Sequence, residues 1–276
     1  MAAGAFAGAA HGAGGRITLA FVPQENPEKL LGDIEAITRW LSAETGLAVS
    51  GFVTADHAAA IEALRNGDAD ISFMGALPFV LAEAEIGAEP LLSEVYRGAA
   101  TYRGRIFVLR DGPVRSLADL AGRSIAFADP ISESGYLFPL DLFVGAGLAE
   151  DAAAARRFFD QVYFAGGYQQ AMQALAEGLV DAAGASEFAD LLLTPEQRRS
   201  VTWIAETEPI PSHVVIARPD LDEGARTVVV AALLRLNEPA NRPLLAHLYG
   251  PEGYVVADLA AFEPVRALAR RHGLLE

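Results

Sequence analysis

The chain has 276 residues, 52% of them hydrophobic, and it carries 36 acidic against 21 basic residues, for a formal net charge of −15. This charge repels the phosphate backbone of nucleic acids and anionic membrane surfaces, so neither is an expected partner. No apolar run approaches the ~20 residues that a membrane span needs, so we expect a chain that is not inserted in a membrane. The sequence contains no cysteine, which excludes disulfides, thiolate metal sites and a cysteine nucleophile.

Residues 1–15 are almost wholly Ala and Gly, and we expect them to lack fixed structure. They have neither the basic front nor the apolar centre of a secretory signal, but such small residues are typical of the tail left by signal cleavage. We therefore expect a periplasmic or extracytoplasmic protein whose signal peptide has been removed. The alternative is a native Ala/Gly arm on a cytosolic protein.

Strands and helices alternate along the rest of the chain. Arg16–Phe21 is a short β-type run, and a helical period follows over Pro27–Thr45. Ser124–Phe127 begins in the same way, with an apolar strand, a proline break and a new helix near Ser134. Towards the C-terminus the pattern predicts one strand and two helices, at Val201–Glu206, Leu221–Leu236 and Ala257–His272.

Two later segments share the same residue pattern at the same spacing. In each, a helix presents Ala-Leu, stops at a glycine able to take the left-handed conformation, and leads through an aspartate into an apolar strand. The matching positions are Ala63, Leu64, Gly67 and Asp70 in the first copy and Ala174, Leu175, Gly178 and Asp181 in the second. The alternative is a chance similarity between alanine-rich helices.

Two such halves predict two lobes, each with a mostly parallel sheet flanked by helices. The chain should cross between them near Tyr102–Ile106 and return near Val201–Glu206. Lobe 1 then comprises 16–100 and 207–276, and lobe 2 comprises 101–206. Because the strand-to-helix turns of parallel sheets gather at one edge, a ligand is expected in the gap between the lobes.

The segment Tyr102–Phe143 resembles the phosphate, phosphite and phosphonate periplasmic binding proteins of ABC importers. The resemblance rests on Tyr102, on the Ser-Leu-Ala-Asp-Leu turn at Ser116–Leu120 and on the Asp-Pro-x-Ser-x-Ser-Gly-Tyr motif at Asp129–Tyr136, and it extends over about residues 16–251. It implies a type II-like periplasmic binding protein fold whose hinge-connected lobes close around a small oxyanion or oxyacid. It also implies an ABC permease as partner and no cofactor or metal.

The Ser-x-Ser-Gly-Tyr helix start also has a physical basis as an anion site. Ser132 and Ser134 flank a helix N-terminus, where hydroxyl groups and unpaired N–H groups, including those of Gly135 and Tyr136, can hold an oxyanion. The helix dipole adds about 0.3–1 kcal/mol for an exposed anion. The alternative is a plain helix cap, in which each serine bonds only to its own helix.

Glu133 departs from the family motif, which the resemblance implies carries Thr at this position. If Glu133 faces the gap, its ionised carboxylate can only accept hydrogen bonds, so it favours a ligand with its own proton or amine over a bare dianion. The candidates are a monoprotonated phosphorus oxyacid, an aminophosphonate, or a neutral hydroxy-acid such as an arsenite-like species. The alternative is that Glu133 turns to solvent and only complements the helix dipole.

Four further residues complete the expected ligand site. By the resemblance, His57 replaces a ligand-facing Tyr and Tyr168 stands where a His is common. Tyr102 lies at the first hinge crossing, where its phenol can bond the ligand while its ring packs. His213 follows the second crossing, where the family often offers an acid to a ligand amine; Glu206 and Glu208 lie nearby in sequence and could substitute for that acid.

Three other classes of protein are alternatives to a component of an importer. An enzyme is not expected, because the sequence has no Gly-x-Ser-x-Gly elbow, no Walker loop and no metal-spaced pair of histidines. A ligand-sensing receptor for signal transduction, which presents its closed form to a membrane histidine kinase, stays the alternative to import, since both use ligand-driven closure. The effector lobes of a transcription factor would need a helix-turn-helix segment before Arg16, which is absent, and a less acidic chain.

Overall fold

The computed structural model describes residues 15–22 and 27–276. The expected Ala/Gly remnant at 1–15 therefore lies outside the described residues, apart from Gly15. Within the described part of the chain, no helix combines the length and the apolar character needed to cross a membrane.

The first sheet has six strands in the order β13-β4-β12-β3-β1-β2. Its elements come from both ends of the chain, as the discontinuous lobe requires. They are β1 (Arg16–Phe21), α1 (Pro27–Thr45), β2 (Ala48–Val53), α2 (His57–Asn66), β3 (Ile71–Met74), α3 (Ala76–Ile86), β4 (Glu89–Val95), β12 (Val214–Ala217), α8 (Glu223–Arg235), β13 (Gly253–Val256) and α9 (Glu263–Arg271).

The second sheet has five strands in the order β10-β6-β9-β7-β8 and is built from the middle of the chain. Its elements are β6 (Gly104–Leu109), β7 (Ser124–Phe127), α4 (Phe138–Gly145), α5 (Ala152–Arg157), β8 (Gln161–Phe164), α6 (Tyr168–Ala176), β9 (Ala182–Ser186), α7 (Pro195–Ser200) and β10 (Val201–Glu206).

Both sheets are mixed, so the expectation of mostly parallel sheets was wrong. β1 pairs in parallel with β2 and β3, and β7 pairs in parallel with β8 and β9. The strands next to the crossings, β12 and β6, pair antiparallel with both of their neighbours. In each sheet, the strands thus pair in parallel where strands and helices alternate along the chain. They pair antiparallel where the chain enters or leaves the lobe.

The two copies of the repeated pattern of helix, glycine, aspartate and strand form the same local structure. Gly67 and Gly178 both have left-handed backbones, with φ of 75° and 72°. Asp70 then accepts the Thr18 N–H at 2.8 Å, and Asp181 accepts the Ser124 N–H at 3.0 Å. Each aspartate therefore ties the start of its own strand to the neighbouring strand, so the repeat predicted from the sequence is confirmed at the level of local geometry.

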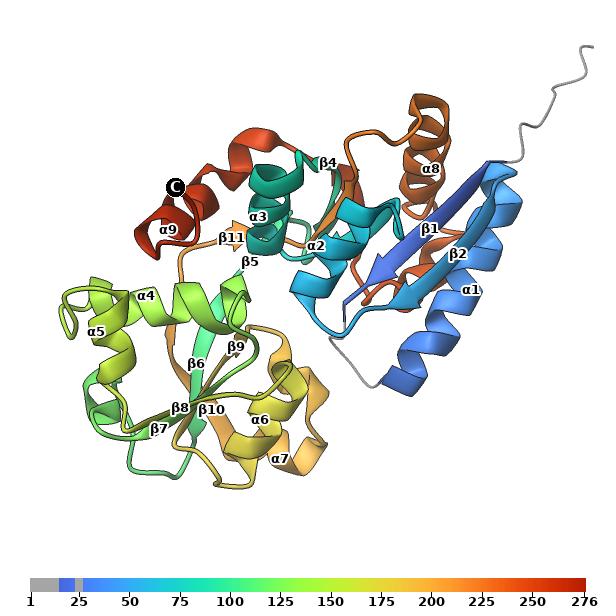
Figure 1. The fold of residues 1–276 in the computed structure, drawn as a ribbon. Coiled ribbons are helices and arrows are strands. Elements are labelled where there is room, and N and C mark those ends of the chain that lie inside the picture. The colour runs from blue at the N-terminus through green and yellow to red at the C-terminus, as the bar shows by residue number, and fades with distance from the viewer. Residues whose placement is uncertain (1–14, 23–26) are drawn as a thin grey trace, which may run out of the picture.

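A short ribbon joins the lobes. β5 (Thr101–Tyr102) pairs antiparallel with β11 (Ile210–Pro211), and Figure 1 shows these two strands between the two sheet-bearing bodies. We propose that the lobe boundaries lie here, with 16–100 and 207–276 in lobe 1 and 101–206 in lobe 2. The chain then crosses twice at one place, as a hinge requires.

The last predicted helix is divided. In place of one helix over Ala257–His272, the structure has a single 3₁₀ turn at Leu259–Phe262 and then α9. Asp258 accepts the N–H of Ala260 at 3.0 Å, which starts the short turn, and a proline lies in the first turn of α9. Pro is favoured at a helix start, so the sequence begins a second helix there.

Candidate functional site

Ser132 is the cap of the segment that carries the recognised motif. Its hydroxyl oxygen accepts the N–H of Gly135 at 3.1 Å, and a single π-type turn at Glu133–Leu137 follows and runs into α4. The sequence left open whether Ser132 caps its own helix or binds a ligand. In the structure, Ser132 caps the turn. The N–H of Gly135 is occupied inside the turn and is not directed at a ligand.

Ser134 belongs to a buried group of hydroxyls. Its Oγ lies 2.8 Å from the Tyr168 hydroxyl, which also lies 3.5 Å from Ser132 Oγ. Tyr168 is the first residue of α6 and follows the pair Gly166-Gly167. Burial, and then the charge of Glu133, raise the pKa of Tyr168 to about 12, so its phenol keeps its proton and can donate a hydrogen bond.

Glu133 reaches across to the other lobe. Its carboxylate accepts the N–H of Ala76 at 3.1 Å and that of Leu77 at 3.4 Å, both at the start of α3. The hydroxyl of Tyr102, at the hinge, donates to the same carboxylate at 2.8 Å. Glu133 is only 2% exposed, so the solvent-facing alternative is wrong.

Tyr102 keeps its proton for the same reason as Tyr168. Burial, followed by the charge of Glu133, raises the pKa of Tyr102 well above its ordinary value. The phenol therefore keeps its proton at neutral pH and donates its hydrogen bond to Glu133. The interaction that the sequence assigned to a ligand is made here with a side chain of the protein.

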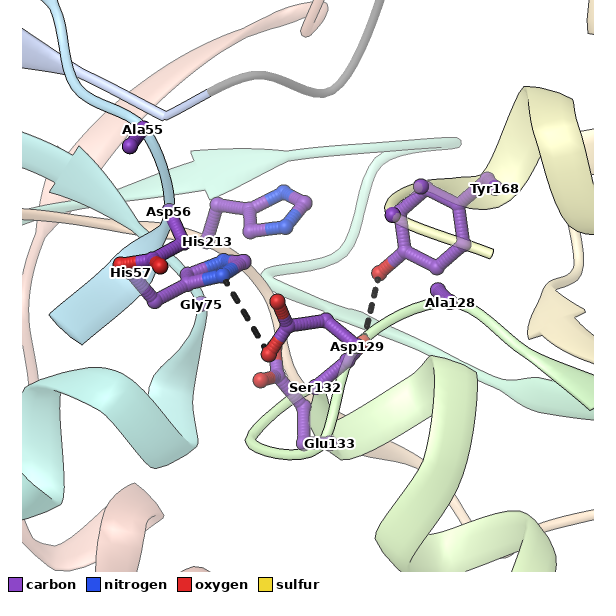
Figure 2. Close-up of a pocket in the computed structure, with 12 residues that line it drawn as sticks. Ala55, Asp56, His57, Gly75, Ala128, Asp129, Ser132, Glu133, Tyr168 and His213 are labelled. Atoms are coloured by element: carbon purple, nitrogen blue, oxygen red, sulfur yellow. Dashed lines mark hydrogen bonds and ion pairs between the residues drawn. The ribbon is translucent and has the colours of Figure 1, made fainter. Parts of the chain in front are cut away.

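His57 and Asp129 face each other from opposite lobes. His57 begins α2, Asp129 follows β7, and the His57 Nδ1 lies 4.0 Å from an Asp129 carboxylate oxygen (Figure 2). Burial lowers the pKa of His57, against the opposing effect of Asp129 and Glu133, so the imidazole is neutral at pH 7. A neutral imidazole can either donate or accept a hydrogen bond.

His213 lies beside a buried carboxylate, that of Glu94. Its Nδ1 lies 3.4 Å from Oε2 of Glu94, which also accepts the hydroxyl of Tyr96 at 2.8 Å. Burial opposes the charge on His213, but contact with Glu94 raises its pKa above the ordinary 6.5. Glu94 is not the ligand-facing acid that the sequence suggested near the second crossing, because it is buried behind His213 and does not line the cavity. Glu206 and Glu208, the candidates from the sequence, do not line the cavity either.

These residues enclose a cavity of about 260 Å³ between the lobes (Figure 2). Its lining combines residues of both lobes: Ala55, Asp56, His57, Gly75, Ala128, Asp129, Ser132, Glu133, Gly166, Gly167, Tyr168 and His213. A second cavity of about 290 Å³ adjoins it, shares Tyr168 and His213 with it, and is lined mainly by aromatic and leucine side chains. No group of three or more potential metal ligands occurs among the described residues.

Five of the nine predicted site residues line the first cavity, namely His57, Ser132, Glu133, Tyr168 and His213. Ser134 and Tyr102 lie behind this lining and contact Tyr168 and Glu133, respectively. Gly135 is closely packed against Ala128, Ser132 and Tyr168. The Tyr136 ring instead points into the aromatic core of lobe 2, where it packs edge-to-face with Phe127 and Phe164, at centroid distances of 4.9 Å and 5.0 Å.

Sequence reasoning missed the lobe 1 half of the Glu133 contact. Gly75 and the first N–H groups of α3 follow a fully buried strand, β3, which ends at Met74. A buried strand followed by Gly and a new helix is the same strand-turn-helix signal that singled out Ser132 in lobe 2. This strand-turn-helix signal was present at Gly75, but the segment lacks the serines that made the corresponding segment of lobe 2 recognisable.

Replacing Tyr168 with Phe is expected to lower the free energy of unfolding by about 0.5–1.5 kcal/mol, because Ser134 then loses its hydroxyl partner in a buried site. Urea denaturation at pH 7 measures the change. Tyr163→Phe, at a half-exposed ring on β8, is the matched control and should leave stability unchanged. Equal stabilities of the Tyr168 variant and the wild type would mean that water replaces the phenol at Ser134.

The sequence profile of the periplasmic substrate-binding proteins of phosphonate ABC transporters matches residues 19–262. The chain belongs to this family. It is also similar to the phosphate-import protein PhnD of Mycolicibacterium smegmatis, with 30% identity over 175 residues, 60% of this chain and 53% of that protein. The chain thus spans about half the length of this curated relative.

Two solved structures have the same fold. A binding protein component of an ABC phosphonate transporter from Pseudomonas aeruginosa superposes with a TM-score of 0.82 at 22% identity, covering 92% of this chain and 85% of that one. PhnD1 from Prochlorococcus marinus, solved in complex with methylphosphonate, gives a TM-score of 0.81 at 16% identity, covering 94% and 98%. The predicted α/β fold with two hinge-connected lobes is therefore confirmed.

Proposed function

We propose that this chain is an extracytoplasmic solute-binding protein that captures a small oxyanion or oxyacid between its lobes and delivers it to an ABC importer. Membership of the family supports the general role. The observation that carries the proposal for this chain is the cavity at the hinge, where donors from both lobes meet: His57 and His213 from lobe 1, and Ser132 and Tyr168 from lobe 2.

Closure of the lobes follows from this arrangement. A ligand that touches both walls makes all of its contacts only when the lobes are together, so binding stabilises the closed form over the open one. Tyr102 lies in the hinge ribbon itself and contacts Glu133 in lobe 2, which links the ribbon to the cavity. A permease that recognises the closed form would then take up only loaded protein.

A thermal-shift panel tests the binding role. Phosphate, phosphite, methylphosphonate, aminoethylphosphonate, arsenite and sulfate are added separately, and at least one is expected to raise the unfolding temperature. A ligand at 100 times its Kd stabilises the folded state by about 2.7 kcal/mol if it binds only that state. Absence of any shift across the panel would contradict the proposal.

Delivery is tested by adding the loaded protein to its candidate ABC importer, reconstituted in vesicles. We expect ligand-dependent stimulation of ATP hydrolysis by the importer. Stimulation of a membrane histidine kinase, with no effect on an importer, would instead assign the chain to sensing. The two outcomes share the same closed form and differ only in the membrane protein that recognises it.

A further inference from the structure

The start of α3 is an anion position that the protein itself fills. The cap residue of α3, Gly75, has no side chain to offer, so the first N–H groups of this 11-residue helix need acceptors from elsewhere. The Glu133 carboxylate supplies them from the opposite lobe, through Ala76 and Leu77. A side-chain anion of lobe 2 therefore caps a helix of lobe 1.

This contact is closely packed. A Cβ added at Gly75 would lie 2.3 Å from an oxygen of Glu133, so the carboxylate rests directly on the backbone of the loop before α3. The third donor, the Tyr102 hydroxyl, completes its surroundings. Two N–H groups and one hydroxyl, which together make a good site for a ligand oxyanion, are thus already occupied.

The remaining cavity is acidic. Its lining carries three carboxylates, Asp56, Asp129 and Glu133, and none of its described residues is Lys or Arg. Of its two imidazoles, His57 is neutral, and the charge on His213 is balanced by the buried carboxylate of Glu94. A dianion placed here would meet like charges at short range, where screening by water is weak.

We infer that Glu133 is an internal anion that occupies the oxyanion position at the start of α3, and that the cavity therefore selects a ligand presenting a proton or a positive charge to Glu133 and rejects a bare dianion. The inference rests on the proposed function and specifies its ligand class. Glu133 thereby both joins the lobes and sets the charge of the ligand that fits between them.

The test uses two probes that differ by one ammonium group, ethylphosphonate and 2-aminoethylphosphonate. Isothermal titration at about pH 9.5, where both phosphonates are almost fully doubly ionised and the amine still carries its proton, is expected to give wild-type protein at least a tenfold preference for the amine. Glu133→Thr frees the donors of Ala76, Leu77 and Tyr102, so ethylphosphonate binding should tighten at least tenfold. Glu133→Gln removes the charge and keeps the size of the side chain. It should reduce the preference for the amine without freeing space at the start of α3.

Two control variants separate the effect of the Glu133 charge from the effect of its side-chain length. Glu133→Asp keeps the carboxylate but shortens the side chain, so it should keep the preference for the amine while losing the α3 contact. Glu62→Gln makes the same charge change at an exposed ion pair with Arg65 and should bind as the wild type does. A crystal of Glu133→Thr with ethylphosphonate is expected to place a phosphonate oxygen at the Ala76 and Leu77 N–H groups.

The outcomes distinguish this inference from the function on which it rests. If wild-type protein binds ethylphosphonate or phosphate as tightly as aminoethylphosphonate, Glu133 does not select the ligand charge, and the inference is overturned while the binding role stands. If Glu133→Thr binds ethylphosphonate no better than wild-type protein does, the donors of α3 are not an anion site. If neither protein binds these two probes but another member of the thermal-shift panel binds, the inference fails and the binding role stands; if no member of the panel binds either, the binding role fails as well.

Discussion

Replacing His213 with alanine is expected to lower the free energy of unfolding by about 3–5 kcal/mol, because the change leaves a buried carboxylate without its counter-charge. Glu94 is 1% exposed, and its Oε1 has no hydrogen-bond partner among the described residues. His213 is the cationic group beside it. Urea denaturation at pH 6, where His213 is protonated, gives the full effect.

The pH dependence of this loss follows from the raised pKa of His213. Its folded-state pKa lies above the ordinary 6.5, so its stabilising contribution is complete below pH 6.5 and is lost as the pH rises through the folded pKa. The gap in stability between wild type and His213→Ala should therefore shrink in alkaline buffer. A gap that grows with pH would show that His213 is neutral in the folded protein.

The double variant Glu94→Gln/His213→Ala is the control for the buried charge. It removes both charges, so it should recover most of the stability that His213→Ala loses. If the double variant is as unstable as the single one, the imidazole stabilises the fold by packing, for example through its ring contact with Tyr102 at 5.5 Å, and not by balancing Glu94.

Replacing Gly75 with alanine is expected to weaken the binding of the best ligand in the panel about 10–100-fold. The new methyl group overlaps the Glu133 carboxylate when the lobes are together. Overpacking of this kind is unfavourable by about 1–3 kcal/mol, and each 1.4 kcal/mol corresponds to a tenfold change in Kd. Isothermal titration measures the affinity, and small-angle X-ray scattering should report a more open protein.

Two variants test the cause of this effect. Gly75→Ala/Glu133→Thr has room for the methyl group and should close again. Gly145→Ala, on α4, adds the same methyl where no atom lies within 4 Å, and should leave binding unchanged. A Gly75→Ala protein that binds as tightly as the wild type would mean that Glu133 leaves α3 when the ligand enters.

Local elements were predictable from the sequence because local rules determine them. The strand at Ser124–Phe127, the helix at Pro27–Thr45 and the paired roles of Asp70 and Asp181 all follow from periodicity, glycine stops and short-range spacing. The antiparallel strands were not predictable in this way. The direction of β12 depends on how the chain returns through the hinge, which periodicity does not encode.

The contacts of the site depend on residues that are distant in sequence. The sequence identified Glu133 as a departure from its motif, but its partner at Ala76 lies 57 positions away in the other lobe. Glu94 and His213 likewise meet only through the pairing of β4 with β12. Tyr136 was assigned to the ligand through its backbone N–H group, and the sequence did not predict that its ring would pack against Phe127 in the core of lobe 2.

A crystal structure with the tightest-binding member of the panel tests the central claim most directly. We predict that the ligand lies between the lobes, within hydrogen-bond distance of Tyr168 on one wall and of His57 or His213 on the other, with any proton-bearing or cationic group directed at Glu133. A ligand found on the outer face of either lobe, with this cavity filled only by water, would contradict the account.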